Sequence, residues 1–259
     1  MPEGDTVWRT ARHLDRALSG HDLTATDFRV PALATTDLRG ERVVETVARG
    51  KHLLTRVGAG LTVHTRLKME GSWHLYRPGA PWRRPAHEAR LVLDTDDWTA
   101  VGFALGIVEL VARDQEHAAV GHLGPDLLAA DWDAEVAPAN LAADEREIGV
   151  AMLDQRNIAG LGTVYRAETL FLAGQSPFLG AADIADLGRL VGLARRLMLA
   201  NLDNPLQVTT GISRRGRQHW VYGRGGEPCR RCGTLVRSAM QGQPPHDRVV
   251  FWCPSCQPG

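Results

Sequence analysis

Apolar residues recur at helical spacing almost from the start of the chain. They follow one another at steps of four, three and four residues, as Val7, Ala11, Leu14 and Leu18. Asp5 or Thr6 is the candidate N-cap, and Ser19-Gly20 is a stop signal. Because this spacing puts the apolar side chains on one face, the pattern predicts an amphipathic helix that ends near residue 18.

Residues 21–120 have the pattern of β structure. Short apolar runs at 61–64 and 91–94 alternate with glycine-containing turns, which is typical of a β-sandwich or barrel. Two turns in this stretch carry charge. Residues 49–54 put Lys51 at a basic tip just before a strand, where an ordinary turn lysine is the alternative. Residues 66–71 flank Met69 with charges, and periodicity leaves open whether Met69 is core filler or an exposed wedge.

From residue 148 the pattern becomes helical. One helix is expected from Ile148 to about Gln155, a second over 164–172, and a third, capped by Asp183, that continues to Met198. Residues 122–140 have the composition of a linker and mark a domain boundary. Between the first two helices, residues 157–163 form an apolar turn with two glycines. Such a turn lets backbone N–H groups approach a phosphate at a helix N-terminus, although a plain helical hairpin has the same pattern.

The four cysteines form two knuckles near the end of the chain. Cys229 and Cys232 are separated by two residues, as are Cys253 and Cys256, and twenty residues lie between the pairs. This spacing is typical of a tetrahedral zinc site whose two turns are joined by a β-hairpin. Two disulfides are the alternative, but the chain has no export signal and a reducing cytosol disfavours them. The predicted zinc is structural because thiolates fill all four positions.

Charge is distributed unevenly although it sums to zero. The net charge is +5 over residues 1–84, −11 over 85–147, zero over 148–204 and +6 over 205–259. If the fold brings the two basic ends together, they make one positive face suited to a polyanion. No apolar run is long enough for a signal peptide or a membrane span, so we expect a cytoplasmic protein that binds no membrane.

The first residues carry candidate chemistry. Removal of Met1 would leave Pro2 with a free secondary amine, and an α-amine has a reference pKa near 8, far below that of lysine. The positive end of the predicted helix should lower this pKa further. Glu3 adds a carboxylate one residue away. A nucleophilic amine beside an acid suits imine-forming catalysis, whereas an ordinary frayed terminus is the alternative.

Six separated motifs occur along the chain in a fixed order. They are PEG at 2–4, RGKHLL at 49–54, LGPD at 123–126, DQRNIAGLGTVYRAE at 154–168, GEPCRRCG at 226–233 and FWCPSCQ at 251–257. From end to end the chain resembles the formamidopyrimidine-DNA glycosylase/endonuclease VIII family. The resemblance implies an α+β fold: an N-terminal helix and β-sandwich domain over 1–122, a helix–two-turn–helix domain over 138–220, and a zinc β-ribbon over 221–259. It also implies that damaged DNA binds in the cleft between the domains.

The resemblance assigns a role to each matching residue. Pro2 would attack the sugar C1′ of a damaged nucleotide and form an imine, and Glu3 would protonate the sugar oxygen. Lys51 would contact phosphate and assist β-elimination, whereas Arg248 would hold phosphate and assist δ-elimination. Met69 matches the residue that fills the gap left by the extruded nucleotide. The structural zinc ion would be held by Cys229, Cys232, Cys253 and Cys256.

Two positions depart from the family pattern. The helix–two-turn–helix turn usually reads GLGN, with the asparagine gripping a phosphate, but here Gly162 is followed by Thr163, and we retain both as DNA-binding candidates. The arginine–phenylalanine pair of the formamidopyrimidine branch should fall near residues 100–104, where no arginine occurs. That absence favours the endonuclease VIII branch, which prefers oxidised pyrimidines. Residues 241–245 look like an insertion that could displace Arg248.

The sequence therefore predicts a bifunctional DNA glycosylase and AP lyase of base-excision repair. We expect it to be a monomer in the cytoplasm, associated with the nucleoid if the source is bacterial. A non-catalytic relative that recognises damaged DNA is the alternative, but such a protein need not keep Pro2, Glu3 and Lys51 together. A zinc-ribbon transcription factor would leave the N-terminal half unexplained.

Overall fold

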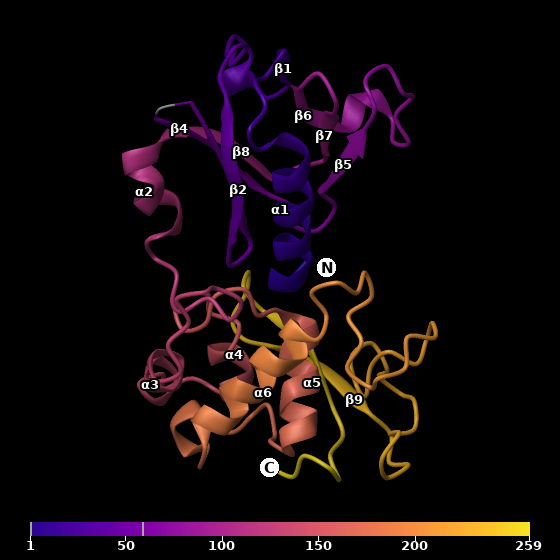
Figure 1. The fold of residues 1–259 in the computed structure, drawn as a ribbon. Coiled ribbons are helices and arrows are strands. Elements are labelled where there is room, and N and C mark those ends of the chain that lie inside the picture. The colour runs from indigo at the N-terminus through magenta and orange to yellow at the C-terminus, as the bar shows by residue number, and fades with distance from the viewer. Residues whose placement is uncertain (1, 59) are drawn as a thin grey trace. The chain divides into compact units, whose positions relative to one another are not determined.

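The chain folds into two units, Met1–His122 and Leu123–Gly259 (Figure 1). The computed structural model describes residues 2–58 and 60–259, so the predicted removal of Met1 lies outside the described residues. The matching family motifs divide in the same way, with the N-terminal helix and the strands in the first unit and the two-glycine turn and cysteines in the second. Each unit has its own hydrophobic core.

The N-terminal unit is a helix with two four-stranded sheets, which confirms the predicted α+β fold. One sheet has the order β2-β3-β4-β8 and the other β1-β6-β7-β5, with antiparallel pairs throughout. The strands are β1 (Ala25–Phe28), β2 (Val43–Arg49), β3 (His52–Val57), β4 (Leu61–Arg66), β5 (Ser72–Tyr76), β6 (Ala89–Asp94), β7 (Thr99–Phe103) and β8 (Ile107–Ala112). Short helices η1 (Pro31–Leu33), η2 (Ala86–Glu88), η3 (Arg113–Gln115) and α2 (Glu116–Val120) lie in the connections.

Helix α1 (Gly4–Leu18) buries the predicted apolar face against this core. It begins earlier than predicted, because Glu3 rather than Asp5 or Thr6 is the N-cap residue. α1 also runs antiparallel to β2. Just beyond the helix, Gly20 N–H donates to Val43 O at 2.8 Å, and further back Asp15 accepts from the Thr46 N–H, also at 2.8 Å.

The C-terminal unit is helical and ends in a two-stranded ribbon. Its elements are α3 (Val136–Ala142), α4 (Ile148–Ala151), α5 (Thr163–Ala173), η4 (Ala181–Asp183), α6 (Leu187–Leu199), β9 (Arg237–Gln241) and β10 (Arg248–Trp252). The two strands pair antiparallel, so the β-hairpin predicted between the cysteine pairs is confirmed. Helix α5, predicted over 164–172, ends at Ala173 and is capped by Gly174, whose φ of 69° is left-handed and favours glycine.

Three local predictions in this unit were wrong. Residues 137–140 are not a linker but most of α3, and Ala137 is fully buried. Helix α4 ends at Ala151 rather than near Gln155. The cap of α6 is Asp186, whose side chain accepts from the Arg189 N–H at 2.8 Å, whereas Asp183 closes a preceding 3-10 turn.

Among the described residues, no helix is both long enough and apolar enough to cross a membrane.

Candidate functional site

The start of α1 and the tip of the β2–β3 hairpin lie at the same end of the N-terminal unit (Figure 1). Asp15 and Thr46 are level with each other through their hydrogen bond. From Asp15 the helix back to Glu3 spans ~18 Å at its rise per residue. From Thr46 the antiparallel strand onward to Lys51 spans ~17 Å. Because the helix and the strand run in opposite directions, both distances lead to the same end, so Glu3 and Lys51 both lie at that end of the unit.

Pro2 and Glu3 form the entry into α1. Glu3 has extended backbone angles, and its carbonyl accepts the first helical hydrogen bond from the Val7 N–H at 3.0 Å. The Glu3 side chain is fully buried, whereas Pro2 is half-buried. The helix therefore holds a carboxylate in a fixed position next to the residue that becomes the chain terminus when Met1 is removed. Burial is unusual for a glutamate and is common at functional sites.

Lys51 lies in a tight two-residue turn. Arg49 at the end of β2 pairs with His52 at the start of β3, so only Gly50 and Lys51 connect the strands. Gly50 has a φ of 56°, a left-handed conformation that favours glycine, and it is buried. A tight turn between paired strands defines the position of the lysine backbone, and this explains why the RGKHLL motif puts glycine directly before it.

Two buried histidines lie just behind the tip of this hairpin and were not singled out from the sequence. His52 Nδ1 lies 2.8 Å from His64 Nε2, and His64 Nδ1 lies 3.0 Å from a carboxylate oxygen of Glu109. If His64 donates to Glu109, its other nitrogen accepts from His52. Burial, followed by the charges of Arg66, His64 and His122, lowers the pKa of His52 to about 3, so this imidazole is neutral at physiological pH.

Met69 lies on an exposed loop at the same end of the unit. Leu53 near the start of β3 pairs with Thr65 near the end of β4, so residues 67–71 leave the sheet beside the hairpin tip. Leu67 is 2% exposed and packs in the core, whereas Met69 is 67% exposed. Between the two possibilities that the sequence left open, the structure excludes core filler.

The helical unit builds its two-glycine turn from the polar residues of the DQRN motif. The Gln155 side chain donates to the Leu161 carbonyl at 3.0 Å and accepts from the Gly160 N–H at 3.0 Å. Asn157 donates to the Ala151 carbonyl at 3.0 Å. Gly160 has a φ of 92°, which favours glycine. The Gln155 and Asn157 side chains therefore fix the shape of the turn before α5 through these hydrogen bonds.

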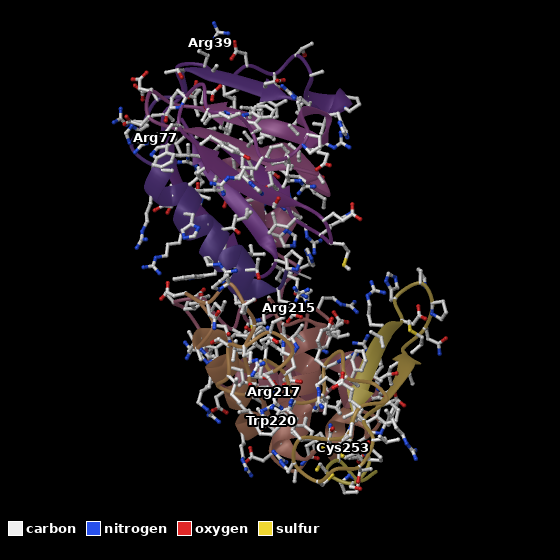
Figure 2. The ribbon with its side chains drawn as sticks, turned by 90° about the vertical axis from the view of Figure 1, so that its right-hand side faces the viewer. Arg39, Arg77, Arg215, Arg217, Trp220 and Cys253 are labelled. Atoms are coloured by element: carbon white, nitrogen blue, oxygen red, sulfur yellow. The ribbon has the colours of Figure 1, made fainter. Side chains whose placement is uncertain are left out.

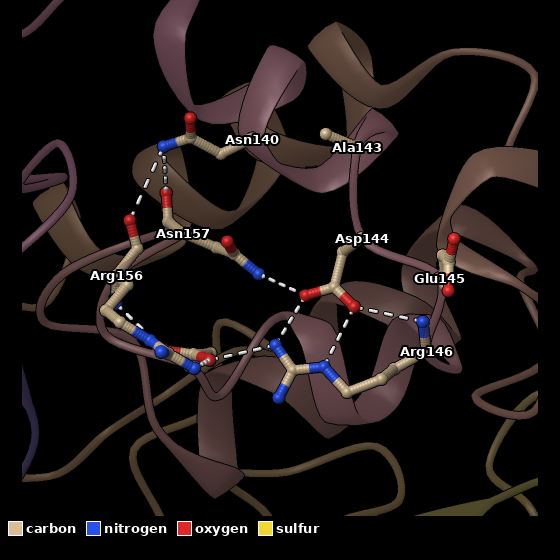
Figure 3. Close-up of a pocket in the computed structure, with 8 residues that line it drawn as sticks. Asn140, Ala143, Asp144, Glu145, Arg146, Arg156 and Asn157 are labelled. Atoms are coloured by element: carbon tan, nitrogen blue, oxygen red, sulfur yellow. Dashed lines mark hydrogen bonds and ion pairs between the residues drawn. The ribbon is translucent and has the colours of Figure 1, made fainter.

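A pocket beside this turn is lined by charges that neutralise one another (Figure 3). Arg146 pairs with Asp144 at 2.5 Å and with Asp154 at 2.8 Å, and Arg156 also pairs with Asp154 at 2.6 Å. Hydrogen bonding from Arg146 lowers the pKa of Asp144 to about 2. Because Asp144 and Asp154 each pair with arginine within the pocket, we interpret it as a structural support for the turn.

Gly162 and Thr163 form the N-terminus of α5. Gly162 is the N-cap residue, and its carbonyl accepts from the Arg166 N–H at 2.9 Å. Thr163, the first helical residue, is only 5% exposed. Little of the threonine side chain is therefore accessible, so the backbone N–H groups of the helix N-terminus are the better candidates for a phosphate contact here.

Glu168 is a further functional candidate that the sequence reasoning missed. Fully buried in α5, it accepts hydrogen bonds from the N–H groups of Trp220, Val221 and Tyr222 at 2.7–2.9 Å, and from the Thr209 hydroxyl. These bonds hold both ends of the exposed basic loop that carries the labelled Arg215 and Arg217 (Figure 2). A glutamate within an otherwise largely apolar helix was the signal that could have revealed it.

The four cysteines meet at one point. Cys253, which is labelled in Figure 2, directly follows strand β10. The sulfur atoms of the four cysteines all lie within 4.8 Å of one another. Cys229 Sγ is 4.0 Å from Cys256 Sγ, and Cys232 Sγ is 3.4 Å from Cys253 Sγ. Four sulfurs at ~2.3 Å from a central zinc would be about 3.8 Å apart in a tetrahedron, so the spacing fits the ion. These sulfur–sulfur distances far exceed the ~2.05 Å of a disulfide, and the cysteines are free thiols.

Arg248 begins β10 directly after the connection between the ribbon strands. It is exposed and pairs in register with Gln241, and its guanidinium donates to the carbonyls of Pro245 at 3.2 Å and Asp247 at 2.7 Å. The insertion-like residues therefore form the tip of the hairpin, and the arginine folds back onto them.

Two family models match the chain. The formamidopyrimidine-DNA glycosylase N-terminal domain matches residues 1–104, and the formamidopyrimidine-DNA glycosylase H2TH domain matches residues 123–201. These matches cover the motifs from Pro2 to Glu168.

Full-length relatives are similar along the whole chain. A probable endonuclease 8 2 of Streptomyces coelicolor is 52% identical, covering 100% of this chain and 95% of its own. The DNA-(apurinic or apyrimidinic site) lyase Nei2 of Mycolicibacterium smegmatis is 48% identical and covers 99% of both chains. The fold matches a Lactococcus lactis Fpg (MutM), solved in a complex with DNA containing N7-benzyl-Fapy-dG, with a TM-score of 0.81 at 23% identity and full coverage of both chains.

Proposed function

The chain belongs to the formamidopyrimidine-DNA glycosylase/endonuclease VIII family, and on that premise we propose that it is a bifunctional DNA glycosylase and AP lyase whose nucleophile is Pro2. It removes an oxidised base from DNA and then cuts the strand. The observation that carries this proposal is that the α1 start, with its buried Glu3, and the Lys51 turn lie at the same end of the N-terminal unit.

The reaction begins at the N-terminal amine. The Pro2 nitrogen attacks C1′ of the damaged nucleotide. The bond from C1′ to the base breaks, the base leaves with the bonding electron pair, and it takes up the proton that the amine loses. Glu3, in its protonated form, gives a proton to the sugar ring oxygen, so the ring opens and an imine links the sugar to the enzyme. Loss of a C2′ proton then expels the 3′ phosphate, with Lys51 contacting phosphate, and a second elimination expels the 5′ phosphate, with Arg248 assisting. Water finally releases the sugar fragment and regenerates the amine.

Damaged DNA is the proposed partner of an enzyme that acts as a monomer. Met69 fills the space left when the nucleotide leaves the stack, because an exposed apolar side chain restores stacking contacts. The N-terminus of α5 at Gly162 and Thr163 binds a phosphate. The relatives named endonuclease 8 2 and Nei2 are bacterial proteins, and we place this chain in the cytoplasm with the chromosome.

We also propose that oxidised pyrimidines are its preferred substrates. The basis is the absence of an arginine over residues 100–104, together with relatives named as endonuclease 8. Moreover, Phe103 is fully buried in the β5–β7 sheet, so this side chain is not presented to DNA.

A nicking assay tests the proposed function against the alternative of a non-catalytic binder. Duplex oligonucleotides carrying one abasic site should be cut by the Met-processed protein, leaving phosphates at both ends of the gap, and duplexes with an oxidised pyrimidine should release the base first. A protein that binds both duplexes but leaves them intact would contradict the proposed enzyme.

Zinc in the ribbon is expected to be essential for DNA binding. Burial raises the pKa of the Cys253 and Cys256 thiols, so a cation is needed to hold all four sulfurs as thiolates at this spacing. We expect one zinc ion per chain, and we expect its removal by a chelator to weaken binding to abasic duplex at least tenfold.

The metal prediction has a direct control. Elemental analysis gives the stoichiometry, and zinc added back should restore binding. Cys253→Ser, at a fully buried ligand, should reproduce the loss. Titration of thiols in the denatured, metal-free protein should find all four. A metal-free preparation that binds DNA normally, or one that contains disulfides, would contradict the assignment.

A further inference from the structure

The loop that carries Met69 has a conformation that needs support from outside. Lys68, directly before Met69, has a φ of 52°, which is a left-handed conformation for a residue that has a side chain. Such a conformation persists only when surrounding contacts fix it. Met69 itself is 67% exposed and contributes little packing of its own. The contacts that hold this loop must therefore come from its neighbours.

The first half of the loop is held by backbone hydrogen bonds. Arg66 O accepts from the Gly106 N–H at 2.9 Å, and Leu67 O accepts from the Gly71 N–H at 3.0 Å. A Cβ at Gly106 would lie 2.4 Å from the Lys68 side chain, so the β7–β8 turn packs directly against the loop. These bonds hold residues 66 and 67, but neither of them involves Glu70, the residue that follows Met69.

Arg84 holds the second half of the loop. It lies in the connection between β5 and β6, and its guanidinium donates to the Glu70 carbonyl at 3.1 Å and to the Ser72 hydroxyl at 2.9 Å. The same guanidinium pairs with Glu88 at 2.5 Å and lies 5.5 Å from the centre of the Phe103 ring. The Arg84 side chain is only 27% exposed. Its Nε and both of its terminal nitrogens are committed to partners within the protein.

Glu88 and Ser72, two of the residues that Arg84 contacts, are themselves held in place by hydrogen bonds. Glu88 lies in η2, and its carbonyl accepts from the Ala104 N–H at 2.7 Å. Ser72 Oγ also lies 3.0 Å from His74 Nε2. Burial, together with the charges of Arg84 and Arg83, lowers the pKa of His74, which leaves a neutral ring able to accept from this hydroxyl. Arg84 thus connects the residue after Met69 to a fixed part of the second sheet.

We propose that Arg84 is a positioning residue that, through Glu70, Ser72 and Glu88, holds the 67–71 loop in the shape that presents Met69 to DNA. The inference rests on the proposed function, because Met69 must enter the DNA for its presentation to matter. In this role Arg84 acts through the loop rather than on the base, since its Nε and both terminal nitrogens have partners within the protein. Because Arg84 already holds the loop in its proposed bound shape, the loop loses less conformational entropy when DNA binds.

The test compares two variants at Arg84 with a matched control. Arg84→Ala and Arg84→Lys remove the forked contact to Glu70 and Ser72, whereas Arg83→Ala removes the same charge from a neighbouring exposed side chain. We expect base excision from a lesion duplex under single-turnover conditions to fall about tenfold in both Arg84 variants and to stay unchanged in Arg83→Ala. Cleavage of an abasic single strand, which has no stack to fill, should stay within about twofold of the parent.

A double-mutant cycle shows whether Arg84 acts through Met69. If it does, Arg84→Ala should slow excision in the parent protein but add little in a Met69→Ala background. Thermal unfolding of every variant identifies any that fails to fold, and the Arg84→Lys variant, which keeps the charge and most of the packing, keeps the test valid if the alanine variant does not fold.

The outcomes separate this inference from the proposed function. If Met69→Ala slows duplex excision but Arg84→Ala does not, or if the two effects are additive, the role assigned to Arg84 is wrong while the enzyme assignment stands. If Met69→Ala itself cuts lesion duplex at the parent rate, Met69 is no wedge and the Arg84 inference falls with that part of the proposal. Equal losses on the abasic single strand would show that Arg84 supports the fold in general.

Discussion

An extension left ahead of Pro2 is expected to lower the rate of strand cleavage at an abasic site by about a thousandfold. In an extended chain the proline nitrogen is part of an amide, so its lone pair is delocalised and cannot attack C1′. DNA affinity should stay within about threefold, because the residues proposed to grip phosphate and hold zinc lie elsewhere in the chain.

The same polypeptide supplies the control for this experiment. A tag joined through a protease site that leaves Pro2 as the first residue should be inactive before cleavage and active afterwards. The identical tag at the C-terminus should have no effect. Single-turnover rates on an abasic duplex, with binding measured in parallel, give the answer. Full activity in the uncleaved chain would rule out the N-terminal amine as the nucleophile.

Glu3→Gln is expected to lower the rate of base release from lesion duplex by roughly 10²–10⁴-fold, the range for loss of a general acid. Glutamine keeps the size of the fully buried side chain and a similar capacity to form hydrogen bonds, but it cannot donate a proton to the sugar oxygen. The variant should therefore stay folded, and only the rate of the chemical step should fall.

Two substrates distinguish this role from a structural one. A lesion duplex requires base loss, whereas a preformed abasic site has already lost its base, so the variant should be impaired much less on the abasic duplex. Glu45→Gln, which removes a half-buried carboxylate from β2, serves as a control for charge. If Glu3→Gln releases the base at the parent rate, Glu3 is not the acid.

Elements that depend on local spacing were predictable from the sequence. The buried face of α1, the strands over 21–120 and the hairpin between the cysteine pairs each have a regular pattern over neighbouring residues. The two-residue turn before His52 also follows from a glycine directly before Lys51. The signals were apolar periodicity for α1 and the strands, and the positions of glycine and cysteine for the turn and the hairpin.

The errors have identifiable physical causes. Pro138 made residues 137–140 look like a linker, but a proline in the first turn of a helix loses no intrahelical hydrogen bond, and α3 begins just before it. Asp183 and Asp186 are equally good caps by residue type, and only the 3-10 turn that ends at Asp183 decides between them.

For residues that act over long sequence distances, the partners could not be predicted from neighbouring residues. Glu168 accepts from N–H groups more than fifty residues away, at Trp220, Val221 and Tyr222. Arg84 looks like any basic residue of a proline-containing loop, and only the folded chain brings it to Glu70.

The central claim is that catalysis depends on the amine of Pro2, and borohydride trapping with identification of the modified residue tests it most directly. Reduction during turnover of an abasic duplex converts the imine into a stable amine linkage, and digestion followed by mass spectrometry locates the sugar. Lys51 is the natural competitor, since its amine is proposed to lie at the same end of the unit. We predict a covalent adduct on the N-terminal peptide at Pro2, which the Pro2→Ala variant loses. An adduct on Lys51, or none from the Met-processed protein, would contradict the account.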